Sequence, residues 1–167
     1  MIYILEDFLL PEDAKTLIKF YNKNTHLCDD MREFHKSRNI HYGVIPDLKI
    51  KSLLKYYEHK NVFFIDHYFK VKTKAYSDLR LVRWKKGESM DLHQDRIPEI
   101  NDMMDFSSLC YLNDDYQGGE LFFETGESFK VKALSCIIFP SGDPYGHGIK
   151  TVIKGKRYTI PSWYKLI

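Results

Sequence analysis

The sequence has few cysteines, no long apolar run and no excess of charge of either sign. The three cysteines are odd in number and far apart, which predicts reduced thiols, two of them buried in strand-like runs, rather than disulfides: Cys28, Cys110 and Cys136. No apolar stretch approaches membrane-spanning length, and Glu6 and Asp7 interrupt an apolar start that lacks the basic region of a signal peptide. These absences predict a soluble, cytoplasmic protein with no membrane partner.

The charge balance and the length narrow the class of protein further. Lysine and arginine number 25 against 23 aspartates and glutamates, which gives a net charge of +2. Because nucleic-acid binders usually carry a concentrated basic surface, this balance argues against nucleic acid as a partner. A chain of 167 residues lies within the range of one domain that buries a substantial core. We therefore expect residues 1–167 to form a single domain.

The first part of the chain carries helical signals. Pro11 suits the first position of a helix, and the apolar residues after it recur on one face, which predicts a helix over residues 11–23. Asp47 is a good N-cap and predicts a second helix from that point. Its apolar face would consist of Ile50, Leu53, Leu54 and Tyr57. Residues 1–75 are therefore expected to form a helical support region that packs on the outside of a sheet.

From residue 79 onward, short apolar segments alternate with glycine-bearing turns, which is typical of β-strands. The predicted strands cover residues 79–84, 90–95, 106–112, 119–124, 127–132, 134–139, 146–153 and 156–164. Short strands in this number, following two helices, predict a mainly β fold of the α+β class. Its core, residues 76–167, would be a double-stranded β-helix (jelly roll) with the helices outside it.

Two short segments far apart in the chain predict a metal site. His93 and Asp95 share one face of the predicted strand because side chains alternate, so one strand can present both ligands. His147, between Gly146 and Gly148, offers a third ligand with no neighbouring side chain to block a metal or substrate. Two imidazoles and one carboxylate leave half of an octahedral iron(II) open, as non-haem oxygenases require. The alternative is a His-x-Asp triplet that arose by chance, and the accompanying motifs decide against it.

The accompanying motifs extend over about residues 79–164. They are Trp84-Lys85-Lys86-Gly87, His93-Gln94-Asp95, Tyr111-Leu112-Asn113-Asp114-Asp115, Gly118-Gly119-Glu120-Leu121, His147, Gly155-Lys156-Arg157 and Trp163. In order and spacing they resemble the prolyl 4-hydroxylase branch of the 2-oxoglutarate- and iron(II)-dependent dioxygenases, and the opening segment 5–13 is similar as well. Two positions depart from that pattern: Trp84 stands where tyrosine is usual, and Met90 where another aromatic residue is common.

The resemblance implies iron(II) as the metal, with His93, Asp95 and His147 as its ligands. It also implies 2-oxoglutarate and dioxygen as cosubstrates, ascorbate as a candidate reductant, and the release of succinate and carbon dioxide. Halogenating relatives lack the carboxylate ligand. The presence of Asp95 therefore favours hydroxylation over halogenation.

A binding site for 2-oxoglutarate follows from the same resemblance. Arg157, ten positions after His147, would pair its planar fork with the distal carboxylate. The alternative is a solvated arginine in a basic hairpin. Tyr111 would donate a hydrogen bond from its hydroxyl to the same carboxylate. Trp84 would line the pocket and offer an indole N–H donor where the family usually has a phenol. Leu121 would line the apolar part, although a core position explains Leu121 equally well.

The sequence leaves the substrate open among several classes. The resemblance implies hydroxylation of a peptidyl prolyl or similar protein side chain. A free amino acid, small metabolite or nucleobase is one alternative, and a non-catalytic jelly-roll binding module is another, which the full set of motif residues disfavours. Residues 96–106, which include Arg96, Met103 and Met104, join the ligand strand to the next and are a candidate substrate lid. A solvated loop is the alternative for that segment. The polar stretch 29–43 is a candidate for a second flexible flap, although we expect a solvated loop there.

Overall fold

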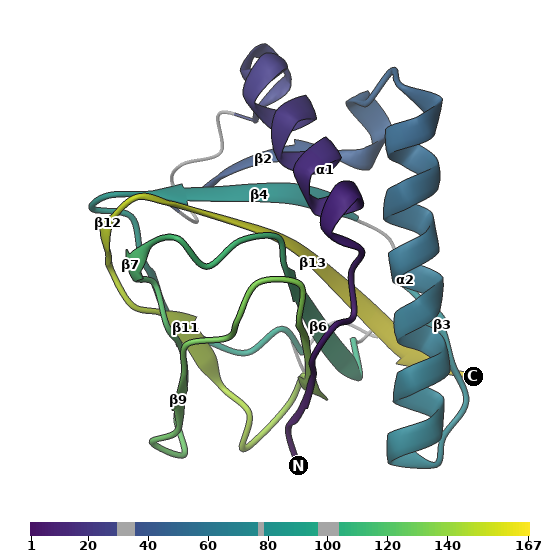
Figure 1. Ribbon diagram of the computed structural model, residues 1–167. Coiled ribbons are helices and arrows are strands. Elements are labelled where there is room, and N and C mark those ends of the chain that lie inside the picture. Colours follow the sequence, from purple (N-terminus) through teal and green to yellow (C-terminus); the bar gives the residue numbers. More distant parts are fainter. Residues whose placement is uncertain (30–35, 77–78, 97–103) are drawn as a thin grey trace.

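The computed structural model describes residues 1–29, 36–76, 79–96 and 104–167. Over these ranges two β-sheets pack together, and two α-helices, α1 (Pro11–Lys23) and α2 (Leu48–Phe69), cover the outer face of the larger sheet (Figure 1). The strands are β1 (Tyr3–Leu5), β2 (Arg38–His41), β3 (Thr73–Ala75), β4 (Arg80–Lys85), β5 (Met90–His93), β6 (Phe106–Tyr111), β7 (Gln117–Gly118), β8 (Leu121–Phe123), β9 (Ser128–Phe129), β10 (Cys136–Pro140), β11 (His147–Ile149), β12 (Val152–Lys154) and β13 (Lys156–Leu166).

Both predicted helices are confirmed. Pro11 occupies the start of α1, where its missing N–H costs no hydrogen bond. Asp47 caps α2, because its carboxylate accepts hydrogen bonds from the backbone N–H groups of Lys49 (2.9 Å) and Ile50 (3.2 Å). Neither of these described helices is long and apolar enough to span a membrane.

The larger sheet has the strand order β1-β10-β6-β13-β4-β2, and β3 pairs with the end of β13. The long strand β13 lies at its centre, bonded to β6 along one part of its length and to β4 along another. Three strands of this sheet, β1, β2 and β3, precede residue 79, where the sequence predicted helices alone. That expectation was wrong, because strands of three or four residues are too short to show alternation. The prediction of a solvated loop over residues 29–43 is corrected in the same way, since β2 lies inside it.

The smaller sheet has the order β5-β11-β8-β9, and a two-stranded ribbon joins β12 to β7. Each strand predicted after residue 79 has a counterpart, with two differences. β5 ends at His93, so Asp95 follows the strand instead of lying on it. The predicted segment 146–153 is divided between β11 and β12. The predicted mainly β architecture with helices on the outside is confirmed.

Two apolar layers hold the described parts of the chain together. One lies between the helices and the larger sheet and includes Leu17 and Leu54, and the other lies between the two sheets and includes Phe139. Side chains alternate along β13, so Tyr158 faces the helices while its neighbour Arg157 faces the space between the sheets. The inner face of the larger sheet therefore carries polar side chains such as that of Arg157 into the space between the two sheets.

Candidate metal centre and its pocket

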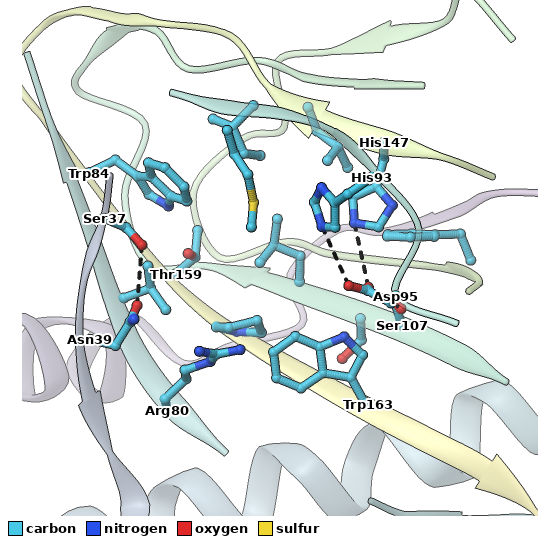
Figure 2. Close-up of a pocket in the computed structure, with 18 of the residues that line it drawn as sticks. Ser37, Asn39, Arg80, Trp84, His93, Asp95, Ser107, His147, Thr159 and Trp163 are labelled. Carbon is cyan, nitrogen blue, oxygen red and sulfur yellow. Dashed lines mark hydrogen bonds and ion pairs between the residues drawn. The ribbon is translucent and has the colours of Figure 1, made fainter. Parts of the chain in front are cut away.

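His93, Asp95 and His147 lie together, with potential ligand atoms within 4.8 Å of one another. The Nε2 atom of His93 lies 3.5 Å from Oδ1 of Asp95, and the Nε2 atom of His147 lies 3.5 Å from Oδ2 of the same carboxylate. Figure 2 shows both imidazoles directed at this carboxylate from one side. Such spacings suit a metal ion that takes each nitrogen and oxygen at about 2 Å. The three residues predicted from the sequence thus form one cluster.

Strand pairing brings the two histidines together. His147 of β11 lies directly opposite His93 of β5 in the antiparallel register, and their ring centroids are 4.6 Å apart. The Nδ1 atom of each ring faces a backbone carbonyl oxygen two residues earlier, at 3.0 Å for His93 and 3.1 Å for His147. These contacts fix each ring with Nε2 toward Asp95, and a backbone contact of this kind commonly sets the tautomer of a metal-binding histidine.

The glycines beside His147 serve the packing of its neighbours. A Cβ atom on Gly148 would lie 2.6 Å from both the carbonyl oxygen of Met90 and the ring of Phe122, and one on Gly146 would lie 2.8 Å from the carboxylate of Glu124. A side chain at either position would therefore clash with backbone or side-chain atoms of neighbouring residues around the site. The close approach of the Met90 backbone requires glycine at position 148, whereas at position 146 the mobile end of the Glu124 side chain could move aside.

The carboxylate of Asp95 is held in its charged form. Ser107 donates a 2.6 Å hydrogen bond to Oδ2, and the Ser107 hydroxyl also contacts that of Ser141 at 2.7 Å. Burial alone would raise the pKa of Asp95, but hydrogen bonds from His93 and Ser107 and the nearness of His147 lower this pKa well below its usual range. The cluster therefore offers an anionic oxygen ligand throughout the physiological pH range.

The two imidazoles differ in their affinity for protons. Burial lowers the pKa of His147 to about 4, so this ring is neutral near pH 7 and can ligate a metal. At His93, burial opposes protonation, but the adjacent Asp95 carboxylate outweighs it and raises the pKa. A metal ion at this site would therefore compete with a proton mainly at His93.

A cavity of about 420 Å³ opens beside the three residues, between the two sheets. Its walls are mostly apolar, formed by Val82, Met90, Leu109, Phe139 and Ile149 among others. A volume of this size suits a small ligand, and apolar walls exclude water from reactive groups. The cluster thus faces a mostly apolar cavity where a metal could keep open coordination positions.

Arg157 lies in the same cavity and is 1% exposed, unlike a solvated arginine in a hairpin. Its Nη2 donates a hydrogen bond to the hydroxyl of Tyr111 (3.1 Å), and its guanidinium lies 4.8 Å from the centre of that ring. The Nε atom of Arg157 and the hydroxyl of Thr159, also in the cavity, are buried without a hydrogen-bond partner among the described residues. A buried cation with a free donor is unfavourable alone, so this wall is suited to an anion.

The remaining predicted site residues lie in and around this cavity. Trp84 and Leu121 line it. Of the candidate lid, Met104 lines the cavity, whereas Arg96 lies outside its lining with Nη1 4.0 Å from Asp105, and Met103 lies outside the described residues.

Several lining residues were not assigned a role by the sequence analysis. Ser37, just before β2, Asn39 of β2, Arg80 of β4 and Trp163 of β13 all line the cavity, and Figure 2 labels them. The alternation of β4 could have indicated Arg80, because it shares a face with Trp84. Nothing local could have indicated Ser37 and Asn39, because their place depends on the pairing of β2 with β4.

Sequence comparison identifies a family and relatives that match part of the chain. A family model described as the 2OG-Fe(II) oxygenase superfamily matches residues 79–165. Prolyl 3-hydroxylase 2 of Homo sapiens is 39% identical over 75 residues, which cover 41% of this chain and 11% of that protein. Prolyl 3-hydroxylase 3 of Homo sapiens is 36% identical over 75 residues, or 41% of this chain and 10% of that protein. The match spans only about a tenth of these relatives.

Structural comparison covers nearly the whole chain. A viral collagen prolyl hydroxylase of Paramecium Bursaria Chlorella virus-1 has a TM-score of 0.77 at 18% identity, covering 99% of this chain and 96% of that chain. A Pseudomonas putida prolyl-4-hydroxylase has a TM-score of 0.76 at 16% identity (99% and 92%). A Trichoplax adhaerens prolyl hydroxylase, solved with a hypoxia inducible factor peptide fragment, has 0.75 at 14% (98% and 82%). These likenesses confirm the jelly-roll fold, and with a family model matching more than half of its residues, the chain belongs to the 2OG-Fe(II) oxygenase superfamily.

Proposed function

We propose that this chain catalyses the 2-oxoglutarate- and iron(II)-dependent hydroxylation of a prolyl or similar side chain in a peptide. The observation that carries the proposal is one cavity that contains both the cluster of His93, Asp95 and His147 and the buried guanidinium of Arg157. Family membership supports the same chemistry, because this superfamily uses iron(II), 2-oxoglutarate and dioxygen. The prolyl hydroxylases among its relatives support a peptide substrate.

The residues fit these groups. Two imidazole nitrogens and one carboxylate oxygen are the donor set that iron(II) oxygenases use, and three donors leave coordination positions for other ligands. Arg157 fits the distal carboxylate of 2-oxoglutarate, since a guanidinium pairs with a carboxylate through parallel N–H groups. Thr159 and Tyr111 would add hydroxyl contacts on the same side. Iron(II), 2-oxoglutarate and dioxygen, when bound, would supply the oxidising power, with 2-oxoglutarate and dioxygen consumed to give succinate, carbon dioxide and one oxygen atom for the substrate.

The protein's own contribution would be binding, orientation and the exclusion of water. His93, Asp95 and His147 would hold the metal at one end of the cavity, with Ser107 fixing the carboxylate. Trp84 and Leu121 would wall the cosubstrate, and the apolar side chains around them would keep solvent from the reactive centre. Hydroxylation is favoured over halogenation because Asp95 provides the carboxylate ligand that halogenating relatives lack.

We also propose that residues 1–167 act as one catalytic domain, because strands from both parts of the chain build the larger sheet. A reducing compartment such as the cytoplasm is proposed from the thiols. Cys110 and Cys136 are buried and free, with sulfur atoms 3.2 Å apart. Because disulfides persist in oxidising compartments and are rare in the cytosol, two neighbouring free thiols support a reducing compartment.

The test is succinate release with iron(II), 2-oxoglutarate and ascorbate over a panel of prolyl peptides, free amino acids and nucleobases. We expect succinate to form in step with the gain of one oxygen atom by a prolyl peptide, and His147→Ala to abolish both. Coupled turnover of an amino acid or nucleobase, but of no peptide, would overturn the peptide assignment. A protein that binds iron(II) and 2-oxoglutarate but turns over none of the panel would favour a binding module.

A further inference from the structure

Strand β5 forms one edge of the smaller sheet and ends at a ligand of the candidate metal centre. The order of this sheet is β5-β11-β8-β9, so β5 pairs with β11 alone among the described strands. Met90 and His93, the first and last residues of β5, both line the cavity. A segment of chain that lies along the other side of β5 would therefore lie beside the metal cluster and the cavity.

The pairing of β5 with β11 is interrupted in the middle of the strand. The first and last residues of β5 lie opposite residues of β11 that are two apart, so Asp91 and Leu92 face the single residue Gly148. Such a bulge leaves part of the longer strand without a partner in the ladder. The carbonyl oxygen of Asp91 lies 3.0 Å from Nδ1 of His93, and a carbonyl oxygen can accept a second hydrogen bond. The bulge therefore adds backbone groups to those that the edge leaves free.

Both residues of the bulge are exposed, and neither lines the cavity. Leu92 is 51% exposed although its side chain is large and apolar. The carboxylate of Asp91 has no ion pair or hydrogen bond within the part of the chain that the structure describes. A free sheet edge presents unpaired N–H and C=O groups, with which another chain can pair. Beside the cluster, β5 thus offers backbone hydrogen bonds, an apolar surface and a negative charge.

The occupant that fits this edge is an extended peptide. A peptide beside a free strand adds to the sheet through main-chain hydrogen bonds, and its alternate side chains point to opposite faces. If one residue faces the cluster, its two neighbours therefore face outward. Proline has no N–H, so it suits a position whose backbone points away from β5. The hydrogen bonds to β5 then fall on the residues beside the proline.

We propose that the peptide substrate docks as an added strand along the free edge of β5, and this rests on the proposed peptide hydroxylation. The prolyl ring faces the cluster, and at least one residue next to the proline donates its backbone N–H to β5. The side chain of that residue lies on the outer face with Asp91, so this subsite selects lysine or arginine. The net charge of +2 cannot produce this selection, because it attracts anionic peptides in general.

Binding can be measured without turnover, because both tryptophans, Trp84 and Trp163, line the cavity and their fluorescence can report on ligands. The protein is loaded with zinc in place of iron and saturated with 2-oxoglutarate. It is then titrated with acetylated and amidated prolyl peptides that each carry a methyl group on one backbone nitrogen.

The position of the methyl group tests the pairing with β5. We expect methylation of at least one neighbour of the proline to weaken binding at least about ten-fold, because it removes a donor and blocks its approach. Methylation two residues from the proline, on either side, should change the affinity less than about two-fold, because those N–H groups point away from β5.

The charge preference is tested with lysine, alanine or glutamate at the position that is sensitive to methylation. We expect the lysine peptide to bind about 2–5-fold more tightly than the alanine peptide, and the glutamate peptide to bind most weakly. Asp91→Asn should remove this order and keep the sensitivity to methylation, because the backbone of β5 is unchanged. The matched control is Glu12→Gln, an exposed acidic residue of α1, on the far face of the larger sheet. It should retain both properties.

A peptide that is hydroxylated with iron(II) but binds equally well in every methylated form would overturn docking on β5 and leave the proposed function standing. No binding of any peptide to the zinc-loaded protein would overturn the docking as well. A lysine preference that is absent, or that survives Asp91→Asn, would overturn the role of Asp91. Failure of the proposed function is separate, because it appears as the absence of succinate and hydroxylated peptide with iron(II).

Discussion

His93 and His147 face each other across the antiparallel pairing of β5 and β11, with ring centroids 4.6 Å apart. Because side chains alternate along a strand, a slip of one residue in this pairing would turn one imidazole away from the other. The register is held by packing on both sides of β11, where Gly148 admits Met90 and Phe122 too closely for any side chain. The geometry of the cluster is therefore a consequence of strand register.

Removal of one ligand should remove the metal and leave the fold. We expect His147→Ala to reduce iron(II) affinity by more than about 100-fold, because loss of a ligand should exceed the 10–100-fold effect of losing a supporting group. Metal analysis after dialysis measures the affinity, and a thermal melt measures the fold. The control is His67→Ala, an exposed histidine of α2. Full iron occupancy in His147→Ala would show that the cluster is not the iron site.

The support of Asp95 should be measurable separately. Ser107→Ala removes the 2.6 Å hydrogen bond to the carboxylate, and we expect iron(II) affinity to fall about 10–100-fold. Asp95→Asn keeps the shape but removes the anionic charge, and it should lose more. Titration with iron(II) under anaerobic conditions gives both values. Iron affinity that is unchanged in Ser107→Ala would mean that this hydrogen bond does not orient the ligand.

Arg157 should control cosubstrate binding and leave metal binding intact. Arg157→Lys keeps the charge and loses the fork, so we expect 2-oxoglutarate affinity to fall several-fold, and Arg157→Ala should cost more. Calorimetry with zinc in place of iron isolates the binding step. Lys156→Ala, an exposed neighbour on the same strand, is the control and should bind normally. Equal affinity for wild type and Arg157→Ala would assign the carboxylate to another basic residue.

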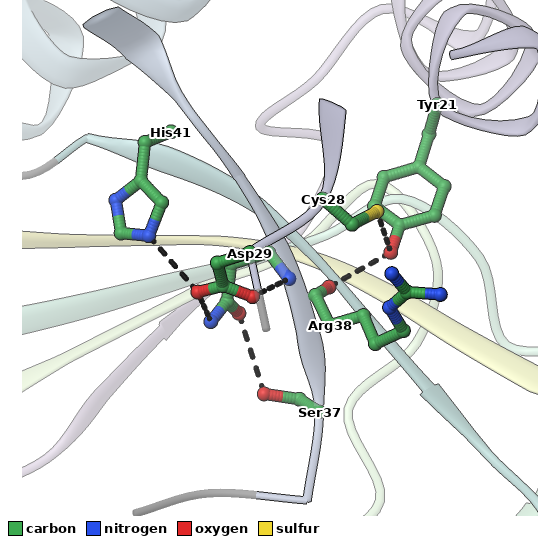
Figure 3. A network of polar contacts seen from close by, with 7 residues as sticks. Tyr21, Cys28, Asp29, Ser37, Arg38 and His41 are labelled. Atoms are coloured by element: carbon green, nitrogen blue, oxygen red, sulfur yellow. Dashed lines mark hydrogen bonds and ion pairs between the residues drawn. The ribbon is translucent and has the colours of Figure 1, made fainter. Parts of the chain in front are cut away.

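The network around Asp29 should make stability depend on pH. Burial alone would raise the pKa of Asp29, but the hydrogen bonds from Asn39 and His41 (Figure 3) outweigh burial and lower this pKa below its usual value of 3.8. A lowered folded-state pKa means that the stabilisation is present above the unfolded value and is lost as the pH falls. We expect Asp29→Asn to lower the free energy of unfolding by about 1–2 kcal/mol at pH 7 and by less below pH 3.8.

Denaturant unfolding of the wild type and Asp29→Asn across this pH range provides the measurement. Glu6→Gln is the control, because the ion pair of Glu6 with Lys132 is largely exposed and should contribute little. A difference between wild type and Asp29→Asn that does not change with pH would contradict the role of the carboxylate charge.

The sequence predicted what local patterns encode. The 11–23 helix follows from Pro11 and a periodic apolar face, and the start of α2 follows from the cap at Asp47. The His-x-Asp triplet and the distal His147, recognised from the order of the motifs, predicted three residues that lie together in the structure. The expectation that one strand presents both His93 and Asp95 was wrong, because β5 ends at His93. These features depend on spacing within a few residues or on motif order.

What the sequence did not predict depends on contacts between distant segments. The place of Asn39 in the cavity requires β2 to pair with β4, and β2 has only four residues. The support of Asp95 by Ser107 requires the chain after β5 to approach β6, and no local pattern indicates that approach. The position of Asp95 beyond the end of β5 likewise depends on where the pairing with β11 stops.

Gly118, at the end of β7, should be needed for its backbone shape. Gly118 has a φ of +72°, and a Cβ atom there would lie 2.9 Å from the backbone nitrogen of Ile153 and closer still to the carbonyl oxygen of Thr151. We expect Gly118→Ala to lower the free energy of unfolding by at least about 2 kcal/mol, because left-handed strain adds to a clash with backbone atoms. Gly43→Ala, where a Cβ atom meets nothing within 4 Å, should change it by less than about 0.5 kcal/mol. Equal stabilities of the two variants in urea would show that the turn at Gly118 accommodates a side chain.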